Sequence, residues 1–297
     1  NGRAAGGDSD RLGIVAGRPL EPGWTGKLWA LDQGLEEAKK VSPEATYILL
    51  TDADIAHDPE NLRRLVAKAE NHRLDLVSLM VLLHCESPWE HLLHPAFVFF
   101  FQKLYPFPWV NDPDRPDAAA AGGCMLVRRA ALERAGGVGS IRGRLIDDCA
   151  LAERIKRSGP IWLGLTEKVR SLRAHDGLQG IWRMVVRTAF TQLNQSALAL
   201  IGTVVGMALL YLTPPAVTLA GAAGGETAAA LSGLAAWLLM AVAYRPTSRL
   251  YRQPGWLALL LPLAALLFTL MTVDSARRHW RKRGGSWKGR SYKFPIG

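Results

Sequence analysis

The chain has 297 residues, a formal net charge of +10 and a composition that is 49% hydrophobic, which allows one large domain or two. Residues 1–176 carry 23 Lys or Arg and 24 Asp or Glu, whereas residues 177–297 carry 13 Lys or Arg and only two acids, Glu226 and Asp274. Because the excess positive charge lies in the most apolar part, it favours an anionic membrane surface as partner and disfavours a nucleic acid.

The first part of the chain shows strands alternating with helices. The apolar pattern predicts strands at 12–16, 47–51, 75–83 and 118–127, helices at 28–40, 59–71, 129–135 and 149–158, and an irregular aromatic segment at 88–116. This alternation predicts an α/β fold with a largely parallel, doubly wound sheet. The aromatic segment is interpreted as a core layer or a membrane-facing surface, with a substrate groove as the alternative.

The strand at 47–51 stops on two carboxylates one residue apart, Asp52 and Asp54. At the carboxyl end of a strand they lie on the rim of the sheet, where open α/β sheets bind ligands. Two carboxylates form a hard oxygen site suited to Mg²⁺ or Mn²⁺, which can bridge a diphosphate. The alternative is a solvated acidic turn.

A second carboxylate pair, Asp147 and Asp148, stands directly before a helix. One acid in a first turn is a routine cap, but two in succession favour chemistry. Gly122 and Gly123 precede a strand, where they let the backbone approach a ligand closely or form a bulge. His175 stands alone after a strand, and we expect a structural or solvated role for it rather than metal ligation.

The two ends of the chain and its cysteines bear on compartment. Three scattered cysteines, Cys85, Cys124 and Cys149, predict no disulfide framework and fit a reducing, cytoplasmic compartment. The chain opens on Asn1 without a signal peptide, which predicts a sequence shortened at its amino end.

Three apolar segments, at 197–217, 227–244 and 256–273, have the length and composition of membrane spans. They contain no charged residue, which argues against a transporter with a buried ionisable pathway. Residues 177–196 before them predict an amphipathic helix in the headgroup plane. The tail at 277–297 is so basic that we expect it on the cytoplasmic surface, with the third segment not crossing fully.

Four stretches follow one another in the order seen in a known enzyme family. They are Gly26-Lys27-Leu28-Trp29-Ala30-Leu31, Thr51-Asp52-Ala53-Asp54, Gly122-Gly123-Cys124-Met125-Leu126-Val127-Arg128-Arg129 and Asp147-Asp148-Cys149-Ala150-Leu151-Ala152. This order resembles the inverting family 2 glycosyltransferases, which have the GT-A nucleotide-diphospho-sugar transferase fold. Residues 22–30 and 182–190 look like the hopene-associated subgroup. The family's Gln-x-x-Arg-Trp motif stands here as Gln179-Gly180-Ile181-Trp182-Arg183, with its last pair reversed.

The resemblance implies a role for each matching residue. Asp52 and Asp54 would hold the metal and the donor's diphosphate, with Lys27 as a further diphosphate contact or else an exposed helix-start lysine. Asp148 would be the general base, supported by Asp147. The acceptor side would comprise Gly122, Gly123, Trp182 and Arg183, with anchoring at the membrane as the alternative for Trp182. The first strand of the fold, which carries a base-binding aspartate, would precede Asn1.

These expectations divide the chain into a GT-A-like domain at 1–176, an interfacial helix at 177–196, membrane segments at 197–276 and a basic tail at 277–297. The implied function is metal-assisted, inverting transfer of a sugar from a nucleotide-diphosphate donor to a lipid acceptor, which the subgroup makes hopanoid-related. The implied location is the inner membrane, multi-pass, with the catalytic domain cytoplasmic. The alternative is a non-catalytic GT-A-like scaffold in a lipid-modifying complex.

Overall fold

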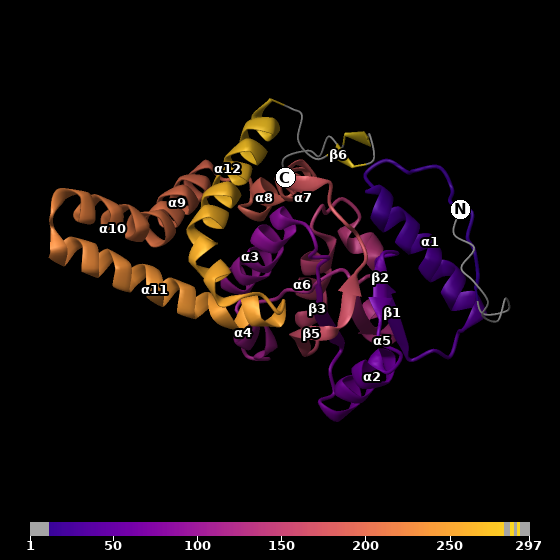
Figure 1. The fold of residues 1–297 in the computed structure, drawn as a ribbon. Coiled ribbons are helices and arrows are strands. Elements are labelled where there is room, and N and C mark those ends of the chain that lie inside the picture. Colours follow the sequence, from indigo (N-terminus) through magenta and orange to yellow (C-terminus); the bar gives the residue numbers. More distant parts are fainter. Residues whose placement is uncertain (1–11, 282–285, 288–289, 292–297) are drawn as a thin grey trace.

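The computed structural model describes residues 12–281, 286–287 and 290–291, and combines a mixed α/β body with long apolar helices (Figure 1). The elements of the body, in chain order, are α1 (Gly26–Val41), β1 (Tyr47–Thr51), β2 (Ile55–His57), α2 (Asn61–Asn71), β3 (Leu76–Leu82), α3 (Pro88–Leu104), α4 (Phe107–Asn111), β4 (Cys124–Arg128), α5 (Arg129–Arg134), η2 (Val138–Ile141), α6 (Asp147–Lys156) and β5 (Ile161–Ser171). The remaining elements are α7 (Gly177–Val186), α8 (Ala189–Gln192), α9 (Ala197–Met207), the π-helical turn η3 (Ala208–Leu212), α10 (Thr213–Gly224), α11 (Thr227–Leu250), η4 (Gly255–Leu260), α12 (Leu261–Trp280), β6 (Ser286–Trp287) and β7 (Arg290–Ser291).

The five-stranded sheet has the order β1-β4-β3-β5-β2. Only β3 and β5 pair in parallel, whereas β1 with β4, β3 with β4, and β2 with β5 are antiparallel. The prediction of a largely parallel sheet is therefore wrong, and the GT-A doubly wound arrangement is not confirmed. Strands β1, β3 and β5 run in one direction, as the alternation predicts. The sheet is nevertheless mostly antiparallel, because β4 lies between β1 and β3 and runs in the opposite direction.

Strands β3 and β4 are buried on both faces, which explains their continuous apolar sequence. Leu76 and Val127 pack on one face of the sheet in the largest hydrophobic cluster, together with Leu28 of α1 and Leu151 of α6. Their neighbours along the strands pack on the other face against Leu65 of α2. The helices that carry Lys27 and Asp148 therefore share one face of the sheet.

Two local predictions are wrong. Residues 12–16 form no strand, and Ile14 there is 84% exposed. Residues 88–104 form the regular helix α3 rather than an irregular segment. Its start is fixed by a capping box, in which the Glu90 N–H donates to Ser87 Oγ (3.3 Å) and the Ser87 N–H donates to Glu90 Oε2 (3.0 Å). Such a start is worth about 1 kcal/mol. The phenylalanines of α3 pack in two hydrophobic clusters, Phe101 in one and Phe99 in the other.

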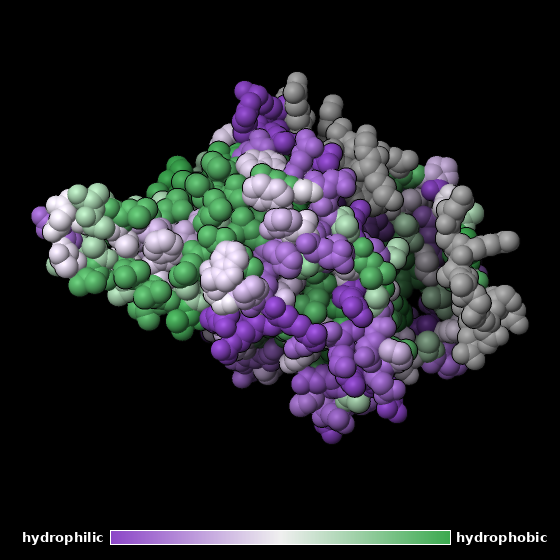
Figure 2. Space-filling model, in the orientation of Figure 1, coloured by the Kyte–Doolittle hydropathy of each residue, from purple (hydrophilic) through white to green (hydrophobic). Residues whose placement is uncertain are grey.

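Three helical segments are long and apolar enough to cross a membrane: Ala197–Gly224, Thr227–Leu250 and Gly255–Trp280. The first two project from the body as a hairpin with a largely hydrophobic surface (Figures 1 and 2). The hairpin packs closely because glycines lie at its crossing: a Cβ added to Gly233 would lie 2.7 Å from the Thr218 nitrogen.

The third apolar segment is more buried within the protein than the hairpin is. Of its most apolar window, 39% of the residues are buried within the protein, against 6% and 17% for the first two segments. Helix α12 packs against α3, α7, α8 and α9. The predicted helix at 177–196 is two short helices, α7 and α8, and Ile181 of α7 is fully buried in the same cluster as Leu261 of α12. The basic tail lies mostly outside the described residues.

Candidate active site

The ends of four elements meet around one small cavity of about 30 Å³. The antiparallel pairing of Thr51 with Cys124 places Gly122, just before β4, beside Asp52, just after β1. The first turns of α1 and α6 add Lys27, Asp147 and Asp148 to the same cavity. The structure thus brings together five residues that the sequence predicted as site residues from four separate motifs.

Lys27 joins the two carboxylate pairs. Its Nζ lies 3.3 Å from Asp52 Oδ1 and 3.0 Å from Asp147 Oδ2. Burial alone lowers the pKa of the Lys27 ammonium, but the charges of Asp147 and Asp52 outweigh it, so the pKa is raised above its usual value. Lys27 therefore stays positively charged and holds the pairs near each other.

Asp148 is tied to the backbone rather than to a cation. Its Oδ2 accepts a hydrogen bond from the Gly122 N–H (2.9 Å) and its Oδ1 accepts one from the Cys149 N–H (2.8 Å). Burial and then the negative charge of Asp147 raise the pKa of Asp148. A carboxylate with a raised pKa is a better proton acceptor, which is the property that a general base requires.

The paired glycines allow this close approach. A Cβ on Gly122 would lie 3.2 Å from Lys27 Nζ and 3.3 Å from Asp148 Oδ2, and one on Gly123 would lie 3.0 Å from Val81 Cγ1. Neither glycine has a positive φ, so the space around the Cβ position, rather than backbone conformation, explains them.

Two arginines that the sequence did not single out complete the charge pattern. Strand β5 pairs with β2 so that Ser171 lies opposite Ile55, and the Leu172 N–H donates to the Asp54 carbonyl (2.8 Å). This register places Arg173 Nε 3.7 Å from Asp54 Oδ2. Arg187, at the end of α7, interacts electrostatically with Asp147, Asp52 and Asp148. Only the fold reveals their place at the site: no motif marks Arg173, and Arg187 lies in the 182–190 stretch of the family resemblance without a role assigned to it.

Trp182 and Arg183, both on α7, lie differently from the other predicted site residues. The Trp182 indole N–H donates to Asp274 Oδ2 of α12 (2.9 Å), and the ring packs in the cluster between α7, α3 and α12. Arg183 is exposed. Neither residue lines the cavity that holds Asp148.

Asp52 and Asp54, at the end of β1, form an acidic rim whose oxygen ligands are of the kind that Mg²⁺ and Mn²⁺ prefer. Asp52 and Asp54 present oxygen ligands on side chains that are 43% and 34% exposed. Among the described residues, they do not belong to any compact group of three or more His, Cys or carboxylate ligands. Mg²⁺ bound by one or two carboxylates completes its shell with water and substrate phosphates, so the rim fits an ion that arrives with a diphosphate.

The sequence matches one family of known proteins. Residues 14–297 match the model described as glycosyl transferase family 21. The comparison with curated proteins found no match. The predicted glycosyltransferase is confirmed at this level, whereas family 2 and the hopene-associated subgroup are not.

Proposed function

This chain belongs to glycosyl transferase family 21, and we propose that it moves a sugar from a nucleotide-diphosphate donor to the hydroxyl of a lipid acceptor with inversion at the anomeric carbon. The observation that carries the proposal is the single cavity into which Lys27, Asp52, Asp147 and Asp148 all project. A carboxylate base and a cation-lined acidic rim are the two parts that such a displacement requires.

The donor occupies the rim in this proposal. Asp52 and Asp54 would hold Mg²⁺ or Mn²⁺, and that ion supplies positive charge against the diphosphate. Arg173, Arg187 and Lys27 present cationic groups around the same rim. They bind the diphosphate and stabilise the negative charge that it gains as it leaves.

Asp148 removes the acceptor proton. The acceptor oxygen forms its bond to the anomeric carbon while the bond from that carbon to the diphosphate breaks. The proton passes to Asp148, and the bonding electron pair leaves with the nucleoside diphosphate. The hydrogen bonds from Gly122 and Cys149 hold the carboxylate in place. Burial, together with the negative charge of Asp147, raises the pKa of Asp148.

The acceptor reaches Asp148 from the side of the membrane helices. A second cavity of about 330 Å³ lies between the start of α6 and α8, and Cys149, the neighbour of Asp148, lines it together with Gln192 and Asn194. Helix α8 leads directly into the apolar segment that starts at Ala197. A polar headgroup fits the cavity while its apolar chains remain beside the hairpin.

The test is transfer of radiolabelled sugar by the full chain in native membranes. Several nucleotide sugars are supplied with Mn²⁺, and membrane lipid extract or purified hopanoids serve as acceptors. We expect a labelled lipid with wild type and with Asp114→Asn, an exposed carboxylate control, and a strong loss with Asp148→Asn. Equal activity in Asp148→Asn and wild type would overturn the mechanism, and no transfer from any donor would favour the non-catalytic scaffold.

A further inference from the structure

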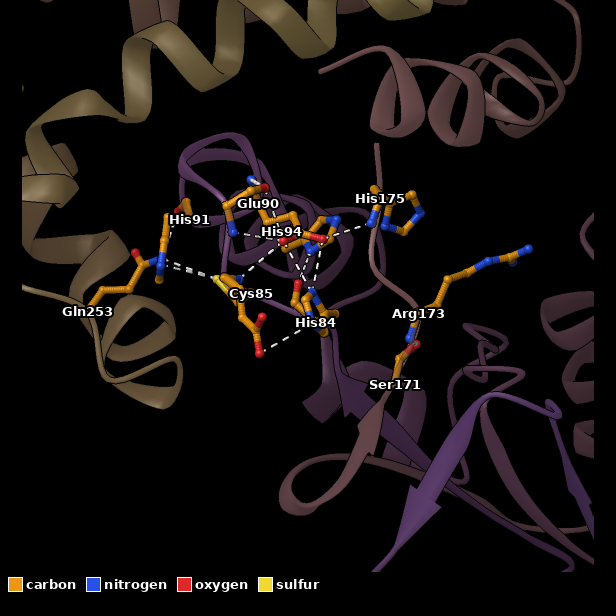
Figure 3. Close-up of polar contacts among 11 residues, drawn as sticks. His84, Cys85, Glu90, His91, His94, Ser171, Arg173, His175 and Gln253 are labelled. Carbon is orange, nitrogen blue, oxygen red and sulfur yellow. Dashed lines mark hydrogen bonds and ion pairs between the residues drawn. The ribbon is translucent and has the colours of Figure 1, made fainter. Parts of the chain in front are cut away.

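A second group of metal-ligand side chains lies apart from the acidic rim, where the start of α3 meets the connection from β5 to α7 (Figure 3). Glu90, His94 and His175 each present a ligand atom, and these atoms all lie within 4.8 Å of one another. Glu90 and His94 are four residues apart and so share a face of α3, whereas His175 comes from the connection.

Two imidazole nitrogens in this group are buried and have no hydrogen-bond partner among the described residues. His94 is fully buried, and its Nδ1 contacts the His84 carbonyl. That contact requires the proton on Nδ1, so Nε2 carries a lone pair, and Nε2 has no hydrogen-bond partner in the part of the chain that the structure describes. The Nδ1 of His175 is likewise buried and unpartnered. Buried polar atoms in native proteins nearly always have a partner, so both nitrogens call for one.

The carboxylate in the cluster is a buried negative charge that is balanced by hydrogen bonds rather than by a basic side chain. The Glu90 side chain is 2% exposed, and within the described part of the chain its only ion-pair partner is His84, which is charged only when protonated. Its Oε1 accepts hydrogen bonds from His84 Nδ1 (3.1 Å) and from the His175 N–H (2.9 Å). Its Oε2 accepts hydrogen bonds from the Glu86 N–H (3.1 Å), the Ser87 N–H (3.0 Å) and Ser87 Oγ (3.0 Å). These hydrogen bonds keep the Glu90 carboxylate ionised, and because no Lys or Arg among the described residues pairs with it, its negative charge suits a bound cation.

We propose that Glu90, His94 and His175 bind a Zn²⁺ ion through Oε1, Nε2 and Nδ1 respectively. Two imidazoles and one carboxylate are a zinc donor set, and the contact from His94 Nδ1 to a carbonyl is the orienting interaction that zinc-binding histidines usually make. Tetrahedral zinc needs ligand atoms roughly 3.3 Å apart, so the cluster closes by about 1 Å or a little more around the ion, with water in the fourth position.

Such a site would hold two segments of the chain together. The ion would join the start of α3 to the connection that carries Arg173, two residues before His175. Because Arg173 lies beside Asp54, the zinc site fixes one side of the donor rim while remaining separate from it. This role differs from the sequence prediction, which gave His175 a structural or solvated role rather than metal ligation.

The experiment measures zinc rather than activity. Full-length protein is purified in detergent, stripped with a chelator and titrated with Zn²⁺, and metal content is read by mass spectrometry. We expect one tightly held Zn²⁺ per chain in wild type and in the Asp52→Asn/Asp54→Asn variant. His94→Gln and His175→Gln should each weaken zinc binding by about 100-fold or more.

The matched control is His91→Gln, because His91 lies on the same helix, contacts Cys85 and Gln253 and is not in the cluster. It should keep wild-type affinity. A substitution at the buried His94 can unfold the protein, so the decisive measurement is made on the wild-type protein. When Co²⁺ replaces Zn²⁺ there, it should give the visible absorption of a tetrahedral site. Wild type that binds no stoichiometric Zn²⁺, or binding that survives both cluster variants, would overturn the assignment.

Discussion

The two clusters of ionisable groups in this molecule differ in how their charge is balanced. At the donor rim each exposed carboxylate faces a basic side chain, with Lys27 on Asp52 and Arg173 on Asp54. At the start of α3, Glu90 is buried, accepts hydrogen bonds from uncharged donors and lies beside two imidazole nitrogens that have no partner among the described residues. Exposed pairs exchange partners readily because water screens their attraction, whereas a buried charge needs a permanent partner. The first cluster suits ligands that leave at every turnover and the second suits an ion that stays.

The largest effect on activity should come from removing the general base, Asp148, beside the acidic rim. Asp148→Asn keeps the shape of the side chain but cannot accept the acceptor proton, so we expect turnover to fall by at least about 100-fold, with donor affinity nearly unchanged. Initial rates and nucleotide binding measured on the same preparation check this. If Asp147→Asn is the inactive variant and Asp148→Asn remains active, the two carboxylates have been assigned in the wrong order.

Metal affinity at the rim should respond next. Asp52→Asn or Asp54→Asn removes a charged oxygen ligand, and we expect Mn²⁺ binding in the presence of nucleotide to weaken by about 10-fold or more. Titration calorimetry measures it, with Asp114→Asn as the matched control. Zinc content should not change in these variants. A joint loss of Mn²⁺ and Zn²⁺ binding would break the distinction between the clusters.

A smaller effect should appear in the pH dependence. The base works deprotonated, so kcat/KM should fall as the pH decreases through the raised pKa of Asp148. In Asp147→Asn one of the charges that raise that pKa is gone, and the acidic limb should move to lower pH by up to about one unit. The measurement is the pH profile of both proteins. A limb that moves to higher pH would show that loosening of Lys27 dominates.

The smallest effect should come from Trp182. Trp182→Phe keeps an aromatic ring but loses the donor to Asp274, which should reduce the free energy of unfolding by about 1–2 kcal/mol. Thermal unfolding in detergent measures the change, and Trp256→Phe, at a tryptophan that is 61% exposed, serves as the comparison. A fall in acceptor affinity without a fall in stability would instead favour the acceptor role that the family resemblance implies.

The sequence predicted the acidic site better than it predicted the sheet. Asp52, Asp148 and the glycine pair stand at the ends of locally recognisable strands and helices, so their neighbourhood follows from where those elements stop. The direction of β4 could not be read locally, because it depends on which strands flank it. Helix α3 was missed although Ser87, Pro88 and Glu90 form a helix-start signature, since the many aromatic residues obscured it.

Contacts between segments that are far apart in the chain could not be predicted from the sequence. Arg173 lies beside Asp54 only because β5 pairs with β2 in one register, and His175 meets His94 only because the connection to α7 passes over the start of α3. Neither pair shares a motif. A lone histidine therefore gave no signal of its cluster.

The double contact of Lys27 has a kinetic consequence. One ammonium group holds both Asp52 on the donor side and Asp147 beside the base, so an ion and diphosphate arriving at Asp52 compete for it. Once Lys27 turns toward the diphosphate, Asp147 loses its cation and its repulsion of Asp148 increases. The base then gains proton affinity only after the donor is in place. We therefore expect an ordered mechanism, in which the nucleotide sugar binds before the lipid.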